Sequence, residues 1–196
     1  MMPPNDMNDA HQCSGGDPSE PEPAEPGQPR RPHADSEVAS DIIEVLDPAG
    51  LLDEDEVELI VDALGRLVER LGRPCLRCAI EVVDDRKMTL LHGRWMNDES
   101  TTDVLTFPMS APEEPIDVDI AVCLDEAERR AGEYGHDRLR ELVLYALHGL
   151  LHVSGHDDHD VEEFRLMHAE EDRLLDAVGL GRVFAAGGHD PSEGHA

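Results

Sequence analysis

Aromatic residues and lysine are scarce in this chain of 196 residues. Phe, Trp and Tyr make up 3% of it, so the hydrophobic core must be built from Leu, Val, Ile and Ala. Lys87 is the only lysine, and 16 basic residues face 45 acidic ones, which gives a net charge of −29. Such a surface repels phosphate backbones. We therefore expect no DNA partner, and an RNA substrate must be met through a local basic patch or be presented by another molecule.

Cysteine is also rare, and long apolar runs are missing. Cys75 and Cys78 form a C-x-x-C pair, which can be a redox site or half of a zinc site. This pair leads into β-type residues and no second pair follows, so we interpret it as structural. No run of eighteen apolar residues occurs, which predicts no transmembrane helix. The N-terminal segment has no apolar stretch after a basic start, as a secretory signal would have, so we expect a cytoplasmic protein without a membrane partner.

The composition along the chain predicts one domain between two tails. Residues 1–38 hold eight of the fourteen prolines together with Gly, Ser and acidic residues, which is typical of a disordered acidic tail. Residues 39–183 contain the periodic apolar patterns and should form the domain. Residues 184–196 have no such pattern, and we expect a loose C-terminal tail.

Alternation of apolar residues predicts strands, and three- and four-residue spacing predicts helices. The expected strands are Ile42–Leu46, a segment that follows Cys78 and ends at Val83, Val104–Phe107 and Val118–Leu124. The expected helices are Asp53–Leu71, Arg86–Trp95, Asp125–Glu133 with Asp125 as its cap, Leu139–Val153 with Asp137 as its cap, and Val161–Val178. This order favours an α/β (α+β) fold with a small four-stranded mixed sheet and about five helices.

The most informative stretch runs from His148 to His159. His148 and His152 are four residues apart on the expected helix 139–153, so both imidazoles leave from one face. Gly155 can adopt the left-handed conformation that ends a helix. The chain would then turn back and deliver a third metal ligand. A chance pair of histidines is the alternative in a chain with eleven of them, but the glycine and the acidic cluster after it favour a metal site.

The third ligand has two candidates. The metzincin spacing H-E-x-x-H-x-x-G-x-x-H places Asp158 at the third position, whereas His159 has the more usual side chain for zinc. We favour Asp158 on spacing and keep His159 as the alternative. Gly149 stands where a metalloprotease has its water-activating glutamate, so a protease is the least favoured function.

Three motifs of this chain resemble those of the YbeY family, bacterial metal-dependent endoribonucleases of ribosome maturation. The stretch from His148 to Gly155 resembles the family's metal signature, and residues 102–108 (TDVLTFP) resemble its T-D-V-L-S-F-P strand. Residues 119–122 (DIAV) resemble part of its G-D-I-x-I strand. The motifs occur in family order, and the resemblance covers about residues 40–182.

The resemblance implies a four-stranded sheet with the metal helix lying against it, and one Zn²⁺ per chain. It also implies single-strand cleavage in the 3′ end maturation of small-subunit ribosomal RNA and in ribosome quality control. The implied partners are ribosomal RNA, the small subunit and its assembly proteins. Asp157, or whichever of Asp158 and His159 is not a ligand, is our candidate for proton transfer or for a partner of the ligands, because it stands beside them.

This chain departs from the family pattern in two places. The family's third histidine falls on Asp158. An arginine implicated in activity falls on Met96, and the nearest arginine is Arg94, our second catalytic candidate. The missing arginine and the charge of −29 favour an alternative function, a ribosome-associated maturation factor with a structural metal and weak or no nuclease activity.

Overall fold

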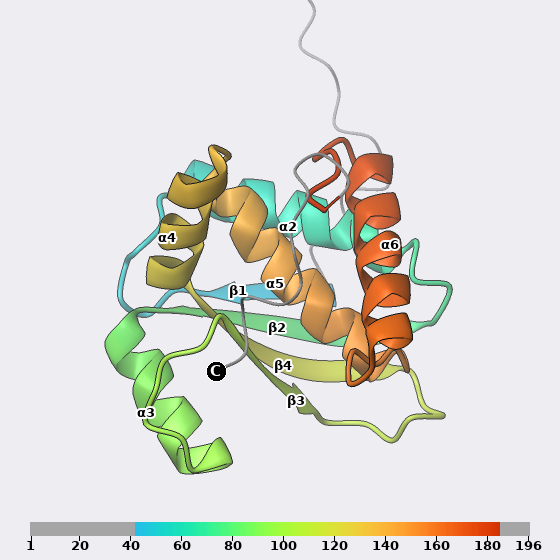
Figure 1. Cartoon of the computed structure of the whole chain (residues 1–196), viewed down its shortest axis with the longest axis horizontal. Coiled ribbons are helices and arrows are strands. Elements are labelled where there is room, and N and C mark those ends of the chain that lie inside the picture. Colours follow the sequence, from blue (N-terminus) through green and yellow to red (C-terminus); the bar gives the residue numbers. More distant parts are fainter. Residues whose placement is uncertain (1–41, 185–196) are drawn as a thin grey trace, which may run out of the picture. The chain divides into compact units, whose positions relative to one another are not determined.

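The structure, a computed structural model, describes residues 42–184. The tails expected at 1–38 and 184–196 therefore lie outside the described residues, apart from Phe184, which packs against the core. The described elements follow the order expected from the sequence (Figure 1). They are β1 (Ile43–Leu46), α2 (Glu54–Val68), β2 (Cys75–Val83), α3 (Asp85–Met96), β3 (Val104–Pro108), β4 (Ile116–Cys123), α4 (Leu124–Tyr134), α5 (Arg138–Val153) and α6 (Val161–Ala177).

The four strands form one mixed sheet in the order β1-β2-β4-β3, which confirms the predicted fold class. Strands β1, β2 and β4 are parallel, and β3 pairs antiparallel with β4 at the edge. Helices α2, α4, α5 and α6 lie on one side of the sheet, and α3 lies on the other (Figure 1). No helix among residues 42–184 has the length and apolar character needed to cross a membrane.

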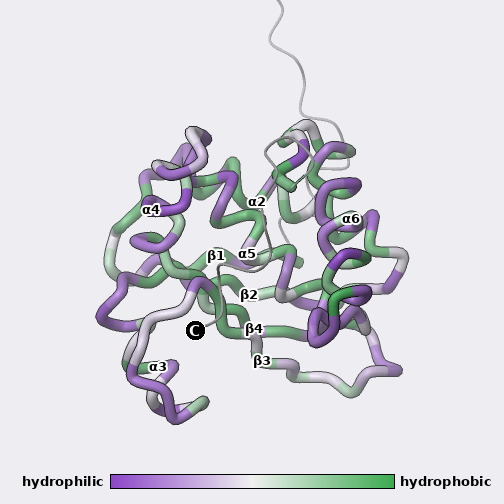
Figure 2. The backbone as a smooth tube through the Cα atoms, viewed as in Figure 1, coloured by the Kyte–Doolittle hydropathy of each residue, from purple (hydrophilic) through white to green (hydrophobic). Residues whose placement is uncertain are grey.

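Alternation along the strands divides the two faces of the sheet. The side chains that face α2 and α5 are apolar and belong to the main core, for example Ile80 on β2 and Ile120 on β4. The opposite face carries a smaller cluster beside α3 that includes Met88 and Leu105. Figure 2 shows the corresponding green, hydrophobic colour along the central strands and in α5.

Aspartates cap most of the helices. Asp53 and Glu56 form a capping box at α2, and the Asp137 carboxylate accepts a hydrogen bond from the Leu139 amide at α5, as predicted. The prediction that Asp125 caps α4 is wrong. Strand β4 runs directly into α4, so the N-cap position falls on buried Cys123, and the Asp125 carboxylate instead accepts a hydrogen bond from the Asp85 amide at 2.7 Å.

Helix α5 is buried along most of its length and approaches the sheet closely at Gly149. A Cβ built on Gly149 would overlap Oγ1 of Thr106 on β3 and would lie 3.2 Å from Cδ1 of Ile120 on β4. Only glycine therefore lets the α5 backbone lie this near to β3 and β4. The two histidines that flank Gly149 on α5 are thereby held beside the edge strand.

Gly149→Ala should destabilise the protein by about 1–3 kcal/mol, the usual cost of overpacking a filled core. The matched control is Gly132→Ala on α4, where an added Cβ meets nothing within 4 Å. That change should stabilise the helix by about 0.5–1 kcal/mol, because glycine loses more backbone entropy than alanine on folding. Thermal and urea unfolding of both variants measures the difference, and an unchanged stability of Gly149→Ala would contradict the close packing of α5 on β3.

Candidate metal centre

The two histidines of α5 present their ring nitrogens to the same point. The Nε2 atoms of His148 and His152 are 3.0 Å apart, as expected for side chains one helical turn apart on one face. His148 Nδ1 lies 2.8 Å from Oε1 of Glu171, and His152 Nδ1 lies 3.3 Å from the carbonyl oxygen of His156. Because each Nδ1 has an acceptor, it carries the proton and leaves Nε2 with a lone pair. In this tautomer both Nε2 lone pairs are available to one metal ion.

The end of α5 brings a carboxylate to these histidines. Gly155 has φ of +99°, and the His156 amide donates to the carbonyl of Leu151, so the chain turns back sharply after Ser154. Asp158 Oδ2 then lies 3.7 Å from His148 Nε2 and 3.8 Å from His152 Nε2. These three donor atoms lie within 4.8 Å of one another and fit a single divalent ion.

The neighbouring cluster residues point elsewhere. His159 is 83% exposed, and its Nδ1 contacts the Asp157 carboxylate. This contact holds the pKa of Asp157 below its usual value and raises the pKa of His159. Asp157, Asp158 and His159 make a second, more exposed group of donors that overlaps the first. The geometry thus favours Asp158 over His159 as the third ligand, and the ligand role itself stays a prediction.

Sequence reasoning missed Glu171, which lies on α6 behind the histidines. Its side chain is fully buried, and its two oxygens accept hydrogen bonds from His148 Nδ1 at 2.8 Å and from His168 Nδ1 at 2.6 Å. Burial by itself raises the pKa of Glu171. The hydrogen bonds from the two histidines lower this pKa by a larger amount, so the net shift is downward. For His148 the signs are reversed. Burial lowers the pKa of the His148 ring, the Glu171 carboxylate raises this pKa by a larger amount, and the net shift is upward.

A signal for Glu171 was present in the sequence. It occupies a position of the apolar stripe of α6, four residues after Met167 and three before Leu174, and all three are buried. A charged residue in such a stripe indicates a buried partner. A carboxylate that holds the outer nitrogen of a ligating histidine is a recurrent feature of metal sites.

A groove of about 430 Å³ runs beside the histidines. It is lined by Met96, Asp103, Val104, Leu105, Thr106, Pro108, His148, His152 and Val153. Edge strand β3 thus forms one wall and α5 the other. Met96, at the end of α3, occupies the groove position at which the resemblance places an arginine. Arg94 is not among the residues that line the groove, and its guanidinium lies 5.2 Å from the centre of the Trp95 ring.

Two further sequence interpretations can be examined in the structure. Cys75 and Cys78 are free thiols on β2, and burial raises the pKa of both, which suits a structural role. Gly149 stands where a protease has its glutamate, and the overlap of an added Cβ with Thr106 leaves no room for that side chain. The geometry therefore counts against the metalloprotease hypothesis.

Comparisons with known proteins identify the family of this chain. A family model described as Endoribonuclease YbeY matches residues 52–179. An Endoribonuclease YbeY of Carboxydothermus hydrogenoformans is 33% identical over 132 residues, which cover 67% of this chain and 92% of the relative. Proteins of the same name from Frankia alni and Mycobacterium tuberculosis are 33% identical over 162 residues and 34% identical over 145 residues. The Frankia match covers 76% of this chain and 89% of the relative. The Mycobacterium match covers 68% of this chain and 81% of the relative.

A solved structure supports the fold. The solution structure of a Thermotoga maritima protein covers 79% of this chain and all of its own, with a TM-score of 0.51 and 21% identity.

Asp158→Ala should lower zinc affinity more than His159→Ala does, because Asp158 Oδ2 lies within 4 Å of both Nε2 atoms, whereas His159 Nδ1 contacts Asp157. Competition against a chromogenic chelator measures both affinities under one set of conditions. The reverse order would assign the ligand role to His159.

Glu171→Gln should weaken zinc binding by roughly 10–100-fold, the usual effect of removing a partner of a ligating histidine. The neighbouring Glu170→Gln is the matched control, since Glu170 pairs with Arg173, whereas Glu171 pairs with His148. Both affinities come from the same chelator competition, with circular dichroism as a check on folding. Equal affinities for the two variants would show that Glu171 does not hold His148 for the metal.

Proposed function

Because the chain belongs to the YbeY family of endoribonucleases, we propose that it hydrolyses phosphodiester bonds of single-stranded RNA in the groove beside His148 and His152. The observation that carries this proposal is the convergence of two imidazole nitrogens and one carboxylate on a single point next to that groove. The donor set has three members, which is the number that leaves a coordination position open for water or substrate.

His148, His152 and Asp158 would hold one zinc ion. Two imidazoles and a carboxylate also suit iron or manganese, and zinc is the choice that the family resemblance favours. When bound, such an ion supplies a Lewis acid for the phosphodiester and an acidified water. Glu171 keeps His148 in the tautomer that exposes Nε2, and His168 holds Glu171 in place from the other side.

Proton transfer falls to the exposed pair beside the ligands. The contact with His159 lowers the pKa of Asp157, so the Asp157 carboxylate is ionised at neutral pH and holds a proton on the His159 ring. His159, which contacts Asp157 and has a raised pKa, can share that proton. Arg94 lies against Trp95 and outside the groove, so a catalytic role of Arg94 would require α3 to move when the substrate binds.

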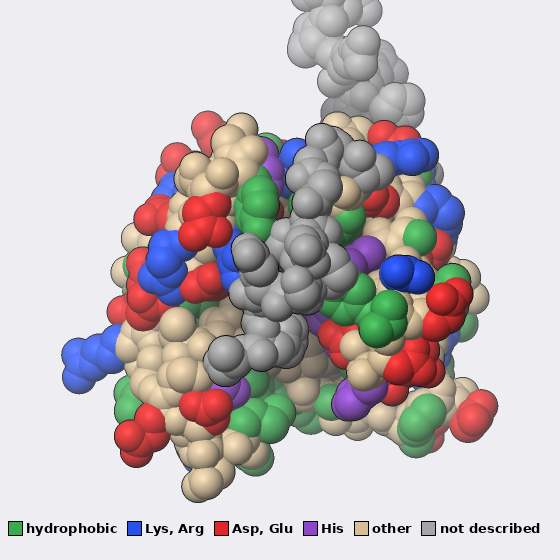
Figure 3. All heavy atoms as spheres, viewed as in Figure 1, with side chains coloured by type: hydrophobic (Ala, Val, Ile, Leu, Met, Phe, Trp, Pro, Cys, Tyr) green, Lys and Arg blue, Asp and Glu red, His purple; other side chains and the backbone are tan. Residues whose placement is uncertain are grey.

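RNA must reach the groove of a strongly acidic protein. Figure 3 shows acidic and basic side chains intermixed over the visible face. Arg73 is placed to help, because its guanidinium donates to the carbonyl oxygen of Val153, which lines the groove. Its other contacts are the carbonyl oxygens of Ala111 and Glu114, and within residues 42–184 it forms no ion pair. Its positive charge is therefore available to a phosphate.

The family resemblance extends the proposal to biology. We assign the enzyme to 3′ end maturation of small-subunit ribosomal RNA and to ribosome quality control, in the cytoplasm and together with small-subunit assembly proteins. A high negative charge suits a nuclease that receives its RNA from a ribosomal particle, because free RNA is repelled. The groove beside an edge strand suits an unpaired strand better than a duplex.

The second candidate function is a maturation factor whose metal is structural. Met96 favours this second function. It lines the groove at the position where the family has an arginine implicated in activity, so this chain lacks that arginine. The two functions differ in what the metal does. A structural metal supports the fold without cleavage of RNA, whereas a catalytic metal supports cleavage and contributes less to the fold.

His148→Ala and His152→Ala should each lose stoichiometric zinc and reduce cleavage of a single-stranded ribosomal RNA fragment to background. Metal content by plasma emission, melting temperature and a gel assay are measured on the same samples. His92→Ala on α3 is the control, because His92 contacts the carbonyl oxygen of Ser100 and lies outside the donor set. Zinc-loaded wild type that cleaves neither RNA nor ribosomal subunits, while the variants melt far lower, would favour the structural metal.

A further inference from the structure

The groove beside the candidate metal ligands has a negative end and a positive end. Asp103 lines the groove and directly precedes the first residue of β3. Arg73 contacts two carbonyl oxygens of the loop that follows β3, and also the carbonyl oxygen of Val153 at the end of α5. A strand of RNA that lies along the groove therefore meets a carboxylate at one end of β3 and a guanidinium at the other.

The Asp103 side chain is held in place through one of its two oxygens. Oδ1 accepts hydrogen bonds from the Val104 amide at 2.8 Å and from the Thr102 hydroxyl at 3.1 Å. The main-chain carbonyl of Asp103 accepts a third hydrogen bond, from the Cys123 amide. Oδ2 forms no hydrogen bond or ion pair with residues 42–184. Asp103 thus presents a fixed carboxylate oxygen that is free to accept a proton donor of a ligand.

The charge of Asp103 reaches the histidine of the candidate metal site. Burial lowers the pKa of His148, Glu171 raises it, and the carboxylates of Asp103 and Asp158 raise it further. The effect of one charge on another falls with distance, so Asp103 and Asp158 both lie near the His148 ring. A group bound to Asp103 is therefore held beside the candidate metal ligands.

The rest of the groove suits the flat face of a nucleobase. Its volume of about 430 Å³ lies within the usual range for pockets that hold one small ligand. Most of the lining side chains are apolar, namely Met96, Val104, Leu105, Pro108 and Val153. An unpaired base has two apolar faces and a polar edge, so it is complementary to apolar walls with one polar group beside them. The thioether of Met96 is a soft, adaptable contact for such a ring.

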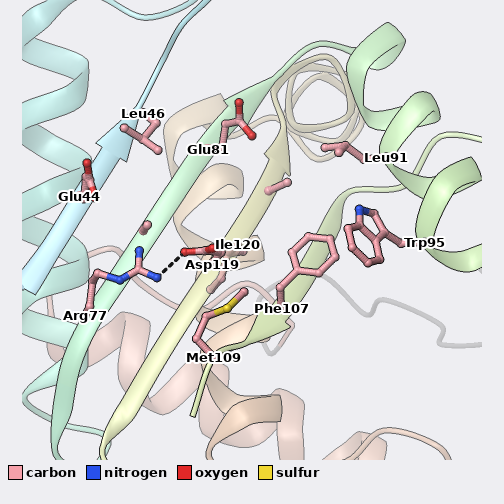
Figure 4. Close-up of a pocket in the computed structure, with 12 residues that line it drawn as sticks. Glu44, Leu46, Arg77, Glu81, Leu91, Trp95, Phe107, Met109, Asp119 and Ile120 are labelled. Carbon is pink, nitrogen blue, oxygen red and sulfur yellow. Dashed lines mark hydrogen bonds and ion pairs between the residues drawn. The ribbon is translucent and has the colours of Figure 1, made fainter.

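The hollow on the other face of the sheet offers no comparable acceptor (Figure 4). It has a volume of about 450 Å³, and Ala79 and Ala121 form its floor. Asp119 lines it, but the Arg77 guanidinium pairs with this carboxylate at 2.7 Å, as the dashed line in Figure 4 shows. Asp119 is therefore already neutralised, whereas Asp103 keeps its charge in the groove.

A free carboxylate in an RNA groove selects among the bases. It repels phosphate and every carbonyl oxygen, and it attracts N–H groups. Aspartate accepts a hydrogen bond from the N4 amino group of cytosine, and adenine and guanine also carry an exocyclic amino group. Uracil has a carbonyl oxygen where cytosine has this amino group. Cytosine and uracil thus have the same size and shape but opposite interactions with Asp103.

We propose, on the basis of the nuclease function proposed above, that Asp103 selects the base beside the cleaved phosphodiester. A base with an exocyclic amino group donates a hydrogen bond to Asp103 Oδ2, and its face lies against Met96 and Val104. Uracil is disfavoured at this position, because its carbonyl oxygen faces the carboxylate. Asp103 is thus a specificity-determining residue, and the metal ligands and Arg73 act on the phosphate.

Cleavage of matched oligonucleotides tests this assignment. The substrates are end-labelled oligouridines that carry cytidine, N4,N4-dimethylcytidine or uridine at one central position. The zinc-loaded full chain should cleave beside cytidine at least about tenfold faster than beside uridine, as expected for a hydrogen bond to a charged group. Dimethylcytidine has no N–H donor, so cleavage beside it should be no faster than beside uridine.

Asp103→Asn should bring the ratio of cleavage at cytidine to cleavage at uridine to about one. The amide can accept from the cytosine amino group and can donate to the uracil carbonyl, and it keeps an oxygen for the Val104 amide. Asp119→Asn is the matched control, because it removes one negative charge outside the groove. It should keep the wild-type ratio. Circular dichroism checks the fold of both variants.

A binding measurement separates this inference from the nuclease function and needs no variant. Cytidine and uridine 5′-monophosphates are titrated into the zinc-loaded wild type and followed by NMR. Cytidine monophosphate should bind at least about tenfold more tightly. This preference without any cleavage of RNA would refute the nuclease function and keep the role of Asp103. Equal binding of the two nucleotides, equal cleavage beside cytidine and uridine, or a cytidine preference that persists in Asp103→Asn would overturn the role of Asp103.

Discussion

The contact between Gly149 and β3 is the constraint on which the site depends. Because Gly149 has no side chain, α5 can lie against Thr106 and Ile120, and the histidines on either side of the glycine reach the edge of the sheet. The same contact makes β3 the wall of the groove. A glutamate in place of Gly149 would push α5 away from the sheet, so the packing that positions the candidate metal ligands leaves no room for the glutamate of a protease.

Glu171 connects this constraint to the rest of the helical layer. It is a fully buried carboxylate between two histidines, one on α5 and one on its own helix α6. Removal of one partner from such a buried pair costs about 3–5 kcal/mol, since a charge is left without compensation. The interaction therefore fixes α6 against α5 and fixes the tautomer of His148 at the same time. One side chain therefore couples the stability of the domain to the geometry of the candidate metal site.

The sheet separates two surfaces that differ in their side chains. On one side, imidazoles and Asp158 converge beside a groove, and Arg73 is a positive charge without a carboxylate partner among the described residues. On the other side, alanines in the middle of the sheet leave an apolar hollow with carboxylates around it. The two surfaces therefore differ in charge and in polarity, and the sheet keeps them apart.

The sequence alone determined the elements, their order and the spacing of His148, His152 and Gly155, because helix and strand periods act over a few residues and are visible as patterns. It also pointed to Asp158, since the turn at Gly155 is local. Tertiary structure alone decided the rest. Glu171 meets His148 across two helices, Met96 and not Arg94 reaches the groove, and Ala79 and Ala121 meet as the floor of a hollow only when β2 and β4 pair. These contacts join residues far apart in the chain, and their distances depend on how whole helices and strands pack, which no local period specifies.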